Sequence, residues 1–579
     1  MEDRARPLIL FGAATLILTA GFGLRDPWPP NEPDNALAAA EMLRYGNWLS
    51  PTLAGELFAE QGPLHLWILG AFQWLFGLRA GFLLPSLLSA FGILWLSWDL
   101  ARRLWDESAA FWSGAALLAC VQFSALAHGG GSEAVLCFLI VLGLYGLARH
   151  LLLGPSWRYF LLGCGGCALG LMIHISALFP LLLFLPWAWS LRRGWTDRRI
   201  GWNWRWLLGA LMLAAIPAAW LSLLWLSDAE AVSSYRLAVL AAWPLGAGTS
   251  SWSDLRPFWY YLLQVAPWAC FPLTLTLPWM RHAWRQRLGQ RDTALFCMLA
   301  WAGAVLFLLS ISQVKRASDF LPVIPALALA CGPAMGAALQ YKNCRRTLWM
   351  GMMAILVVVL VAMLRVYGVA PADEPAVISL SDGSPFWLNL LSPTRLALLL
   401  TINSIHPVAV PLLIVASAAG LAGLLAGGGR RVAAVTGCVI VGVWLLLGWG
   451  AFSVLNEGRS GKTITAAAQA AAPDHAELGL ADWRAQLLLH INRPVTHFGR
   501  LRADRRQEIL DAAAWLNGAP GRLLLAPEEY RSWCFKNESG TLLGYAHRRN
   551  WYLLGPEMLR PECQVEDAPK RVVHFPGWR

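Results

Sequence analysis

Charged residues are scarce in this chain of 579 residues. Only 14% of them are Asp, Glu, Lys or Arg, whereas 57% are hydrophobic. Soluble globular domains are about a quarter charged, so this composition excludes a soluble enzyme and a disordered chain. The chain has 11 cysteines, too few for a disulfide scaffold of this length, and its glycines follow no collagen-like repeat. The protein therefore belongs in lipid.

Acidic residues are fewer than basic ones. The chain has 35 Asp and Glu against 46 Lys and Arg, which gives a net charge of +11. Because no basic groove or base-stacking module accompanies this excess, nucleic acid is not an expected partner. The basic residues gather in short loops between apolar runs, which in membrane proteins face the cytoplasm. The 33 Trp residues, many at the ends of apolar runs, are typical of the bilayer interface.

Apolar runs of about 17 to 22 residues, long enough to cross a bilayer, recur along the chain. They predict about thirteen transmembrane helices with a cytoplasmic N-terminus. The shorter run 63–78 carries His65 and Gln73. Counting it as a span would put most basic loops outside, so it is predicted to lie on the membrane surface. The predicted spans are 7–24, 80–100, 108–127, 134–151, 159–174, 177–191, 206–226, 260–280, 293–311, 319–339, 347–368, 407–427 and 432–454.

The longer segments between spans fall on the non-cytoplasmic side. We expect an all-α polytopic membrane domain over 1–454, with 25–79 as a first periplasmic loop bearing interfacial helices, and a soluble periplasmic α/β domain over 455–579. The last segment mixes alternating runs such as VTHFG with helical stretches such as DRRQEILDAAAWLNG. Cys534 and Cys563 lie in it, where an oxidising compartment allows a disulfide, and two free thiols are nearly as compatible with the sequence.

The first outer loop is rich in acidic and amide side chains. It reads DPWPPNEPDNALAAAEMLRYGNWLSPTLAGELFAEQGPLHLW. Asp34 or Asn35 is the expected N-cap of a helix that includes ALAAAEMLR. When the loop is considered alone, a solvated acidic loop explains these residues as well as a catalytic loop does.

The order and spacing of the loop motifs carry more information than any one of them. They resemble the polyprenyl-phosphate-sugar glycosyltransferases of the GT-C class, especially the bacterial lipid A aminoarabinose transferases and the protein O-mannosyltransferases. The matching pieces are Asn31-Glu32, Ala36 to Met42, Gly46-Asn47-Trp48 and Glu60-Gln61-Gly62-Pro63-Leu64 with Trp67, followed by Ser132-Glu133, PFWYY at 257–261 and SQVKRASDFLP at 312–322. The resemblance covers essentially the whole chain.

The resemblance implies a multi-pass glycosyltransferase of the bacterial inner membrane with a periplasmic active face. Such an enzyme transfers a hexosyl or pentosyl group from a polyprenyl-phosphate donor to lipid A or another envelope glycan or lipid, so donor, acceptor and membrane lipids are the expected partners. A divalent metal is compatible with the sequence but not required by it. The expected catalytic carboxylates are Glu32, Asp34, Glu60 and Glu133, and the expected phosphate-binding cations are Lys315, Arg316 and Arg256.

Three motif positions depart from the family. The catalytic Asp corresponds to Asn31, which cannot accept a proton as a base. The phosphate-binding Lys corresponds to Gln61, and a second Lys is missing at His174-Ile175-Ser176. Glu133 is also one methylene longer than the expected Asp. These changes leave open an impaired homologue that acts as a lipid-binding or partner subunit, whereas a transporter is disfavoured because ionisable residues within the spans are sparse.

Overall fold

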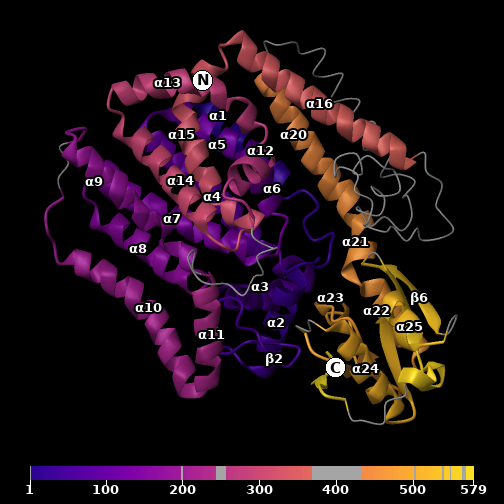
Figure 1. Cartoon of the computed structure of the whole chain (residues 1–579). Helices are drawn as coiled ribbons and strands as arrows, with labels where there is room; N and C mark the ends of the chain where they lie inside the picture. The colour runs from indigo at the N-terminus through magenta and orange to yellow at the C-terminus, as the bar shows by residue number, and fades with distance from the viewer. Residues whose placement is uncertain are drawn as a thin grey trace.

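The computed structural model of the chain describes residues 2–196, 200–242, 256–367, 432–500, 504–536, 540–547, 549–563 and 569–578. Within these ranges the N-terminal part is a bundle of helices, and the C-terminal part is a sheet with helices packed on it (Figure 1). The predicted span 407–427 lies outside the described residues.

Most predicted spans fall on helices of the bundle. These helices are α1 (Glu2–Leu18), α4 (Leu84–Leu104), α5 (Glu107–Ala119), α6 (Val121–Leu126), α7 (Ser132–Leu152), α8 (Trp157–Leu171), η1 (Ile175–Leu183), α9 (Phe184–Arg192), α10 (Arg205–Ser227), α11 (Ala229–Ala242), α14 (Thr293–Ile311), η5 (Ala317–Phe320), α15 (Val323–Ala338), α16 (Lys342–Tyr367) and α20 (Val432–Leu446). Among the described residues, seven helical stretches are long and apolar enough to cross a membrane: Leu84–Leu104, Ser132–Leu152, Ile175–Arg192, Arg205–Ser227, Thr293–Ile311, Ala317–Ala338 and Val432–Trp449. The protein is therefore a multi-pass membrane protein.

The segment predicted as one span over 260–280 is broken into short pieces. It forms η3 (Tyr260–Val265), α12 (Ala266–Ala269) and η4 (Leu273–Leu275) before the longer α13 (Leu277–Gly289). Three prolines, Pro267, Pro272 and Pro278, interrupt this stretch because proline has no backbone N–H to donate within a helix. The prediction of a single helix here was wrong, since it counted apolar residues and ignored the prolines.

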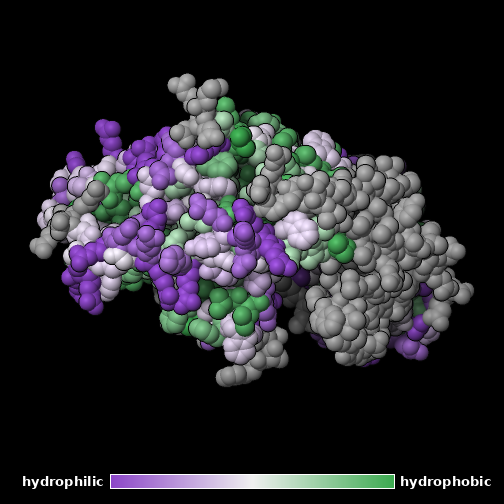
Figure 2. All heavy atoms as spheres, turned by 90° about the horizontal axis from the view of Figure 1, so that it is seen from above, coloured by the Kyte–Doolittle hydropathy of each residue, from purple (hydrophilic) through white to green (hydrophobic). Residues whose placement is uncertain are grey.

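Basic residues gather at one end of the bundle. The N-terminus and α13 lie together at that end, opposite the first loop and the C-terminal sheet (Figure 1). Arg281 and Arg285 of α13 are exposed there. Hydrophilic side chains gather over this end when it is viewed along the bundle (Figure 2). The basic end of the bundle is thus separated from the first loop (Figure 1).

The first loop forms four elements between the bundle and the sheet (Figure 1): α2 (Glu32–Tyr45), β1 (Thr52–Leu53), β2 (Glu56–Leu57) and α3 (Leu64–Gly81). The helix α3 covers the run predicted to lie on the membrane surface and is not one of the seven apolar stretches. The loop shares one hydrophobic core with the C-terminal sheet. Members of that core from the two sides include Leu37, Met42, Leu53 and Phe58 on the loop, and Ile464, Leu478, Leu488 and Phe575 beyond it.

The C-terminal segment contains a six-stranded mixed sheet with the order β6-β7-β5-β3-β4-β8. The strands β3 (Glu477–Leu480), β4 (Val495–His497) and β5 (Arg522–Pro527) are parallel, and β6 (Thr541–Ala546), β7 (Arg549–Leu554) and β8 (Val573–Phe575) pair antiparallel. The helices of this part are α22 (Lys462–Ala471), α23 (Ala485–Leu488), α24 (Arg505–Asn517) and α25 (Glu528–Cys534). VTHFG forms β4 and DRRQEILDAAAWLNG forms α24, as their patterns predict.

A continuous helix joins this segment to the bundle, and a disulfide links two parts of the segment to each other. The last helix of the bundle continues from α20 through η6 (Leu447–Ala451) into α21 (Phe452–Ser460), so the boundary predicted at residue 454 falls within a helix. Cys534 and Cys563 form a disulfide, with their Cα atoms 5.5 Å apart. Of the two readings that the sequence left open for this pair, the structure has the disulfide.

A buried carboxylate ties α4 to α7. Asp99 accepts hydrogen bonds from Arg102 (3.0 Å), Arg103 (2.7 Å) and the hydroxyl of Tyr145 (2.6 Å). The guanidinium of Arg149 lies 3.7 Å from the same carboxylate. Because the three guanidinium groups converge on one negative charge, the carboxylate is needed to offset their mutual repulsion.

The Asp99→Asn variant tests this role. The substitution keeps the size of the side chain and removes its charge, so we expect thermal unfolding of the purified protein to show a loss of about 2 kcal/mol, below the range of fully buried pairs because Arg102 and Arg103 are partly exposed. Glu107→Gln is the control, since that carboxylate lies 3.7 Å from Arg102 in an exposed pair. Equal losses in the two variants would contradict the role of Asp99.

Candidate functional site

A bidentate ion pair lies at the start of the first loop. Arg25 donates from Nη1 to one oxygen of Glu32 (2.6 Å) and from Nη2 to the other (2.8 Å). The side chain of Arg25 is only 3% exposed. Its Cζ atom lies 4.6 Å from the ring centroid of Trp28 and 5.1 Å from that of Phe82. Two parallel hydrogen bonds and two aromatic faces hold the guanidinium in a single orientation.

The same ion pair binds the turn that precedes α7. Glu32 accepts further hydrogen bonds from the backbone N–H groups of Trp28 (2.8 Å) and Gly130 (2.9 Å), and Arg25 donates to the carbonyl of His128. The carboxylate of Glu32 thus has four donors, all from the protein itself. Two segments about a hundred residues apart in the chain are thereby joined through one charge pair.

Asp26 extends the connection to α21. Its carboxylate accepts hydrogen bonds from Arg79 Nε (2.8 Å) and from Asn456 Nδ2 (2.9 Å), and the Asn456 carbonyl oxygen accepts from the indole of Trp28 (2.9 Å). Burial by itself raises the pKa of Asp26, but the hydrogen bonds from Arg79 and Asn456 outweigh it and bring the pKa below its ordinary value. Asp26 is therefore a charged structural link between the loop and α21.

The helix α2 begins earlier than the sequence suggested. Asn31 is its N-cap and makes no side-chain cap bond, so the expected cap by Asp34 or Asn35 is wrong. Pro33 in the first turn explains the early start, because proline suits a position whose N–H needs no partner. Gln61, at the position of the missing Lys, donates from Nε2 to the side-chain oxygen of Asn35 (2.7 Å). This hydrogen bond therefore links the end of the first loop to α2.

Asp34 and Glu60 face a cation that sequence reasoning missed. Arg500, which follows β4, forms an ion pair with Glu60 at 2.7 Å between Nη1 and Oε1. The pKa of Asp34 is raised to about 6, mainly by burial, while the charge of Arg500 lowers it and that of Glu60 raises it. No local sequence signal marks Arg500, because its partner lies in a distant part of the chain. Asp34, Glu60 and Arg500 thus form one electrostatic group, which we name the loop triad.

A second group of charges gathers where α7 and η5 begin. Glu133 lies in the first turn of α7 and interacts electrostatically with Asp319, Glu32 and Arg316. Asp319 accepts hydrogen bonds from the backbone N–H of Arg316 (2.9 Å) and from the hydroxyl of Tyr261 (3.2 Å). Asp319 lies in the SQVKRASDFLP segment, in which the sequence singled out only the two cations. Tyr261 lies in the PFWYY motif, which had been assigned no chemical role.

The remaining predicted site residues differ in their surroundings. Lys315 is buried and its ammonium donates to the carbonyl of Ser312, whereas Arg316 is exposed. His174 Nδ1 accepts a hydrogen bond from the N–H of Ser176 (3.2 Å). The charge of Arg316 acts on His174. Arg316 is thus a predicted cation whose charge acts on Glu133, Asp319 and His174.

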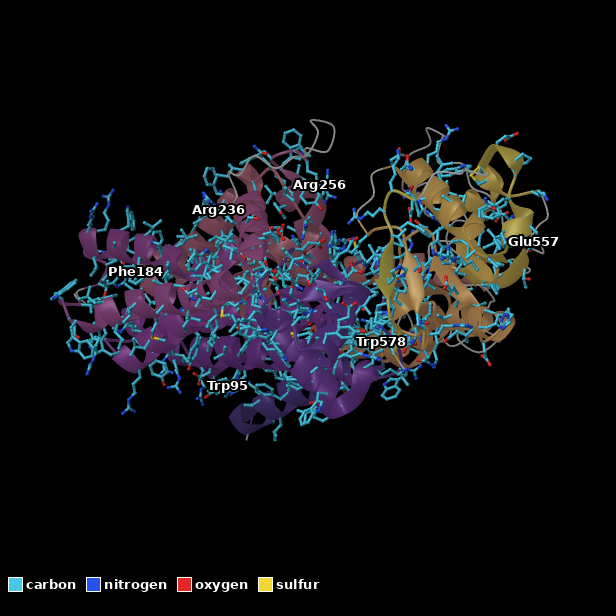
Figure 3. The ribbon with its side chains drawn as sticks, turned by 90° about the horizontal axis from the view of Figure 1, so that it is seen from below. Trp95, Phe184, Arg236, Arg256, Glu557 and Trp578 are labelled. Carbon is cyan, nitrogen blue, oxygen red and sulfur yellow. A yellow bond between two sulfur atoms is a disulfide. The ribbon has the colours of Figure 1, made fainter. Side chains whose placement is uncertain are left out.

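Arg256 lies against an aromatic ring. Its Cζ atom is 4.6 Å from the ring centroid of Tyr260, and its guanidinium donates to the hydroxyl of the same residue. Arg236 and Arg256 lie on the same side of the bundle, well apart from Glu557 at the far side of the C-terminal segment (Figure 3).

Among the residues that the structure describes, no group of three or more His, Cys, Asp or Glu is arranged to hold a metal ion.

Sequence comparison finds relatives with named activities. No protein-family model matches the chain. It is 28% identical over 350 residues to the undecaprenyl phosphate-alpha-4-amino-4-deoxy-L-arabinose arabinosyl transferase of Enterobacter sp. (strain 638), a match that covers 57% of this chain and 59% of the relative. A protein of the same name from Pseudomonas aeruginosa PAO1 is 28% identical over 349 residues, which cover 58% of this chain and 60% of the relative. The chain thus spans about six tenths of the length of these relatives.

Structure comparison covers more of the chain. The crystal structure of ArnT from Cupriavidus metallidurans in the apo state matches 97% of this chain and 100% of its own, with a TM-score of 0.71 and 18% identity. The structure of the same protein bound to undecaprenyl phosphate matches 94% of this chain and 97% of its own, with a TM-score of 0.70 and 19% identity. The chain therefore has the fold of ArnT, and its resemblance to the GT-C glycosyltransferases is confirmed.

Proposed function

We propose that the protein is an integral-membrane glycosyltransferase that moves a sugar from a polyprenyl-phosphate donor to an acceptor on the periplasmic face of the bacterial inner membrane. The observation that carries the proposal is the clustering of carboxylates and guanidinium groups on the first loop and the helix ends around it. A structural neighbour bound to undecaprenyl phosphate supports a donor of this class. The names of the sequence relatives support sugar transfer.

The reaction makes two demands on the site. The bond between C1 of the sugar and the phosphate oxygen breaks while the acceptor oxygen bonds to C1, so the departing polyprenyl phosphate needs a cation. A hydroxyl acceptor also needs a base to take its proton, whereas a phosphate acceptor is already ionised. The two demands correspond to the two charge groups described above.

Asp34 is the base in this proposal. Asn31 cannot take a proton, and the oxygens of Glu32 are bound by Arg25, Trp28 and Gly130. A pKa of about 6 keeps Asp34 mostly ionised at neutral pH and close to the optimum for proton transfer. Glu60 is its charged neighbour, and Glu32 is a positioning residue that holds the loop.

Arg316 is the principal cation for the departing phosphate. It is exposed and interacts with Glu133 and His174. Lys315, whose ammonium donates to the Ser312 carbonyl, and Arg256, whose guanidinium donates to the Tyr260 hydroxyl, are the additional cations in this proposal. A planar guanidinium suits this task because it binds two phosphate oxygens at once.

The proposed orientation follows from charge. The basic N-terminal end of the bundle faces the cytoplasm, so the first loop and the C-terminal sheet at the opposite end face the periplasm (Figure 1). The Cys534–Cys563 disulfide suits that oxidising side. Lipid A or another envelope lipid or glycan would meet the site there.

One observation favours a second candidate, an impaired homologue that binds the lipid without transferring the sugar. Gln61 holds Asn35 where the family has a cation, and Asn31 is exposed where the family has an acid. Such a protein would bind the donor lipid without carrying out the transfer step.

The Asp34→Asn variant tests the proposed enzyme. We expect transfer from a polyprenyl-phosphate-linked sugar to fall by about 100-fold, because the general base is lost. Glu107→Gln, at the opposite end of the bundle, is the control and should leave the rate unchanged. In the wild type, kcat/KM should fall as the pH drops below about 6, where Asp34 becomes protonated. Binding of undecaprenyl phosphate without transfer from any tested donor would favour the second candidate instead.

The anchoring role of Glu32 is tested by a double-mutant cycle with Arg25→Lys and Glu32→Gln. Each single variant breaks the bidentate pair, so the two effects on thermal unfolding should not add, and the coupling free energy should be about 2 kcal/mol. Additive losses would show that the pair does not act as one unit.

A further inference from the structure

Arg500 is a buried cation with an incomplete set of partners. Its side chain is 6% exposed, although the carboxylate that it binds, Glu60, is 53% exposed. Its Cζ atom lies 5.3 Å from the ring centroid of Phe58, and its Nε atom is buried without a hydrogen-bond partner among the described residues. Removing a guanidinium from water in this way is costly, and one ion pair offsets only part of the cost.

Docking of the C-terminal segment does not require this buried charge. The first loop already shares an apolar core with the sheet, in which Leu37 and Leu53 belong to the same cluster as Leu488. His497 hydrogen-bonds to the carbonyl of Ala54 (3.0 Å) across the same boundary. A well-packed apolar side chain would stabilise such a contact at least as well as a buried ion pair does.

The charge of Arg500 reaches two acidic groups at once. Arg500 forms an ion pair with Glu60 and also acts on Asp34. The negative charges of Glu60 and Asp34 repel each other. On α2 itself, Glu32 is bound by Arg25, and Glu41 accepts from Thr52 (2.8 Å). Among the described residues, the charged groups that act on Asp34 are therefore Arg500 and Glu60.

We infer that Arg500 is a positioning residue of the transfer site: it holds Asp34 and Glu60 close together as carboxylates, so that the C-terminal sheet completes a site that the membrane bundle lacks by itself. The inference rests on the proposed function and extends it to a second part of the chain. It also explains how the loop retains a cation next to Glu60 although Gln61 is neutral and bound to Asn35.

The experiment compares Arg500→Gln and Arg500→Lys with Arg571→Gln in the full-length protein. Arg571 is the control because it forms another ion pair across this boundary, with Glu56 at 2.6 Å. The first readout does not depend on activity: a carbodiimide labels protonated carboxyl groups, and peptide mass spectrometry follows the labelling of Asp34 against pH. The second readout is the pH profile of kcat/KM for sugar transfer.

We expect Arg500→Gln to move the midpoint of Asp34 labelling up by about one pH unit, since the opposite charge that favours the carboxylate is gone. The acidic limb of kcat/KM should move up by the same amount. Arg500→Lys should restore most of both shifts, and Arg571→Gln should leave both at their wild-type positions. Thermal unfolding checks that the variants are folded.

An unchanged labelling midpoint in Arg500→Gln, or an equal shift in Arg571→Gln, overturns the inference. A shifted midpoint in a protein whose wild type transfers no sugar overturns the proposed function and leaves the link between Arg500 and Asp34 standing. If Arg500→Gln does not fold, the Glu60→Gln variant tests the electrostatic connection between Asp34, Glu60 and Arg500 instead. Removing that negative charge should lower the midpoint, and an unchanged midpoint again overturns the inference.

Discussion

The bidentate pair of Arg25 and Glu32 is the contact on which the arrangement of the first loop depends. Arg25 is buried and Glu32 is partly buried, so their charges interact in a medium of lowered dielectric constant and leaving Arg25 unpaired would be costly. Through Gly130 and His128 it connects the first loop to the start of α7, where Glu133 lies. The turn before α7 and the start of α2 are therefore held in one arrangement.

Similar side chains have different roles because their surroundings differ. Glu32 is bound on both oxygens, and the pKa of Asp26 is lowered by Arg79 and Asn456, so both are structural anions. Among the described residues no such donor is found for Asp34, and burial raises its pKa to about 6. Separation of the pKa values of nearby carboxylates is the usual way in which a site distinguishes a base from its supporting charges. In the proposed mechanism Asp34 is therefore the base, and Glu32 holds the loop through Arg25.

The first loop belongs to both parts of the chain. It follows the first helix of the bundle, yet its apolar side chains lie in the core of the C-terminal sheet. This shared core explains why Arg500 and Arg571 can reach Glu60 and Glu56. The two segments that the sequence separates into domains therefore share one hydrophobic core at the first loop.

The sequence by itself determined the membrane character, the helical bundle, the outer loop and the family resemblance. Each of these depends on composition, periodicity or motif order, which are properties of neighbouring residues. The broken segment after Tyr260 was also readable from its three prolines, although the count of apolar residues obscured it. The tertiary structure alone decided that Glu32 is held by Arg25, that Tyr261 meets Asp319, and that Arg500 meets Glu60. Contacts between residues far apart in the chain leave no local pattern, because they are specified by packing between elements and not within one.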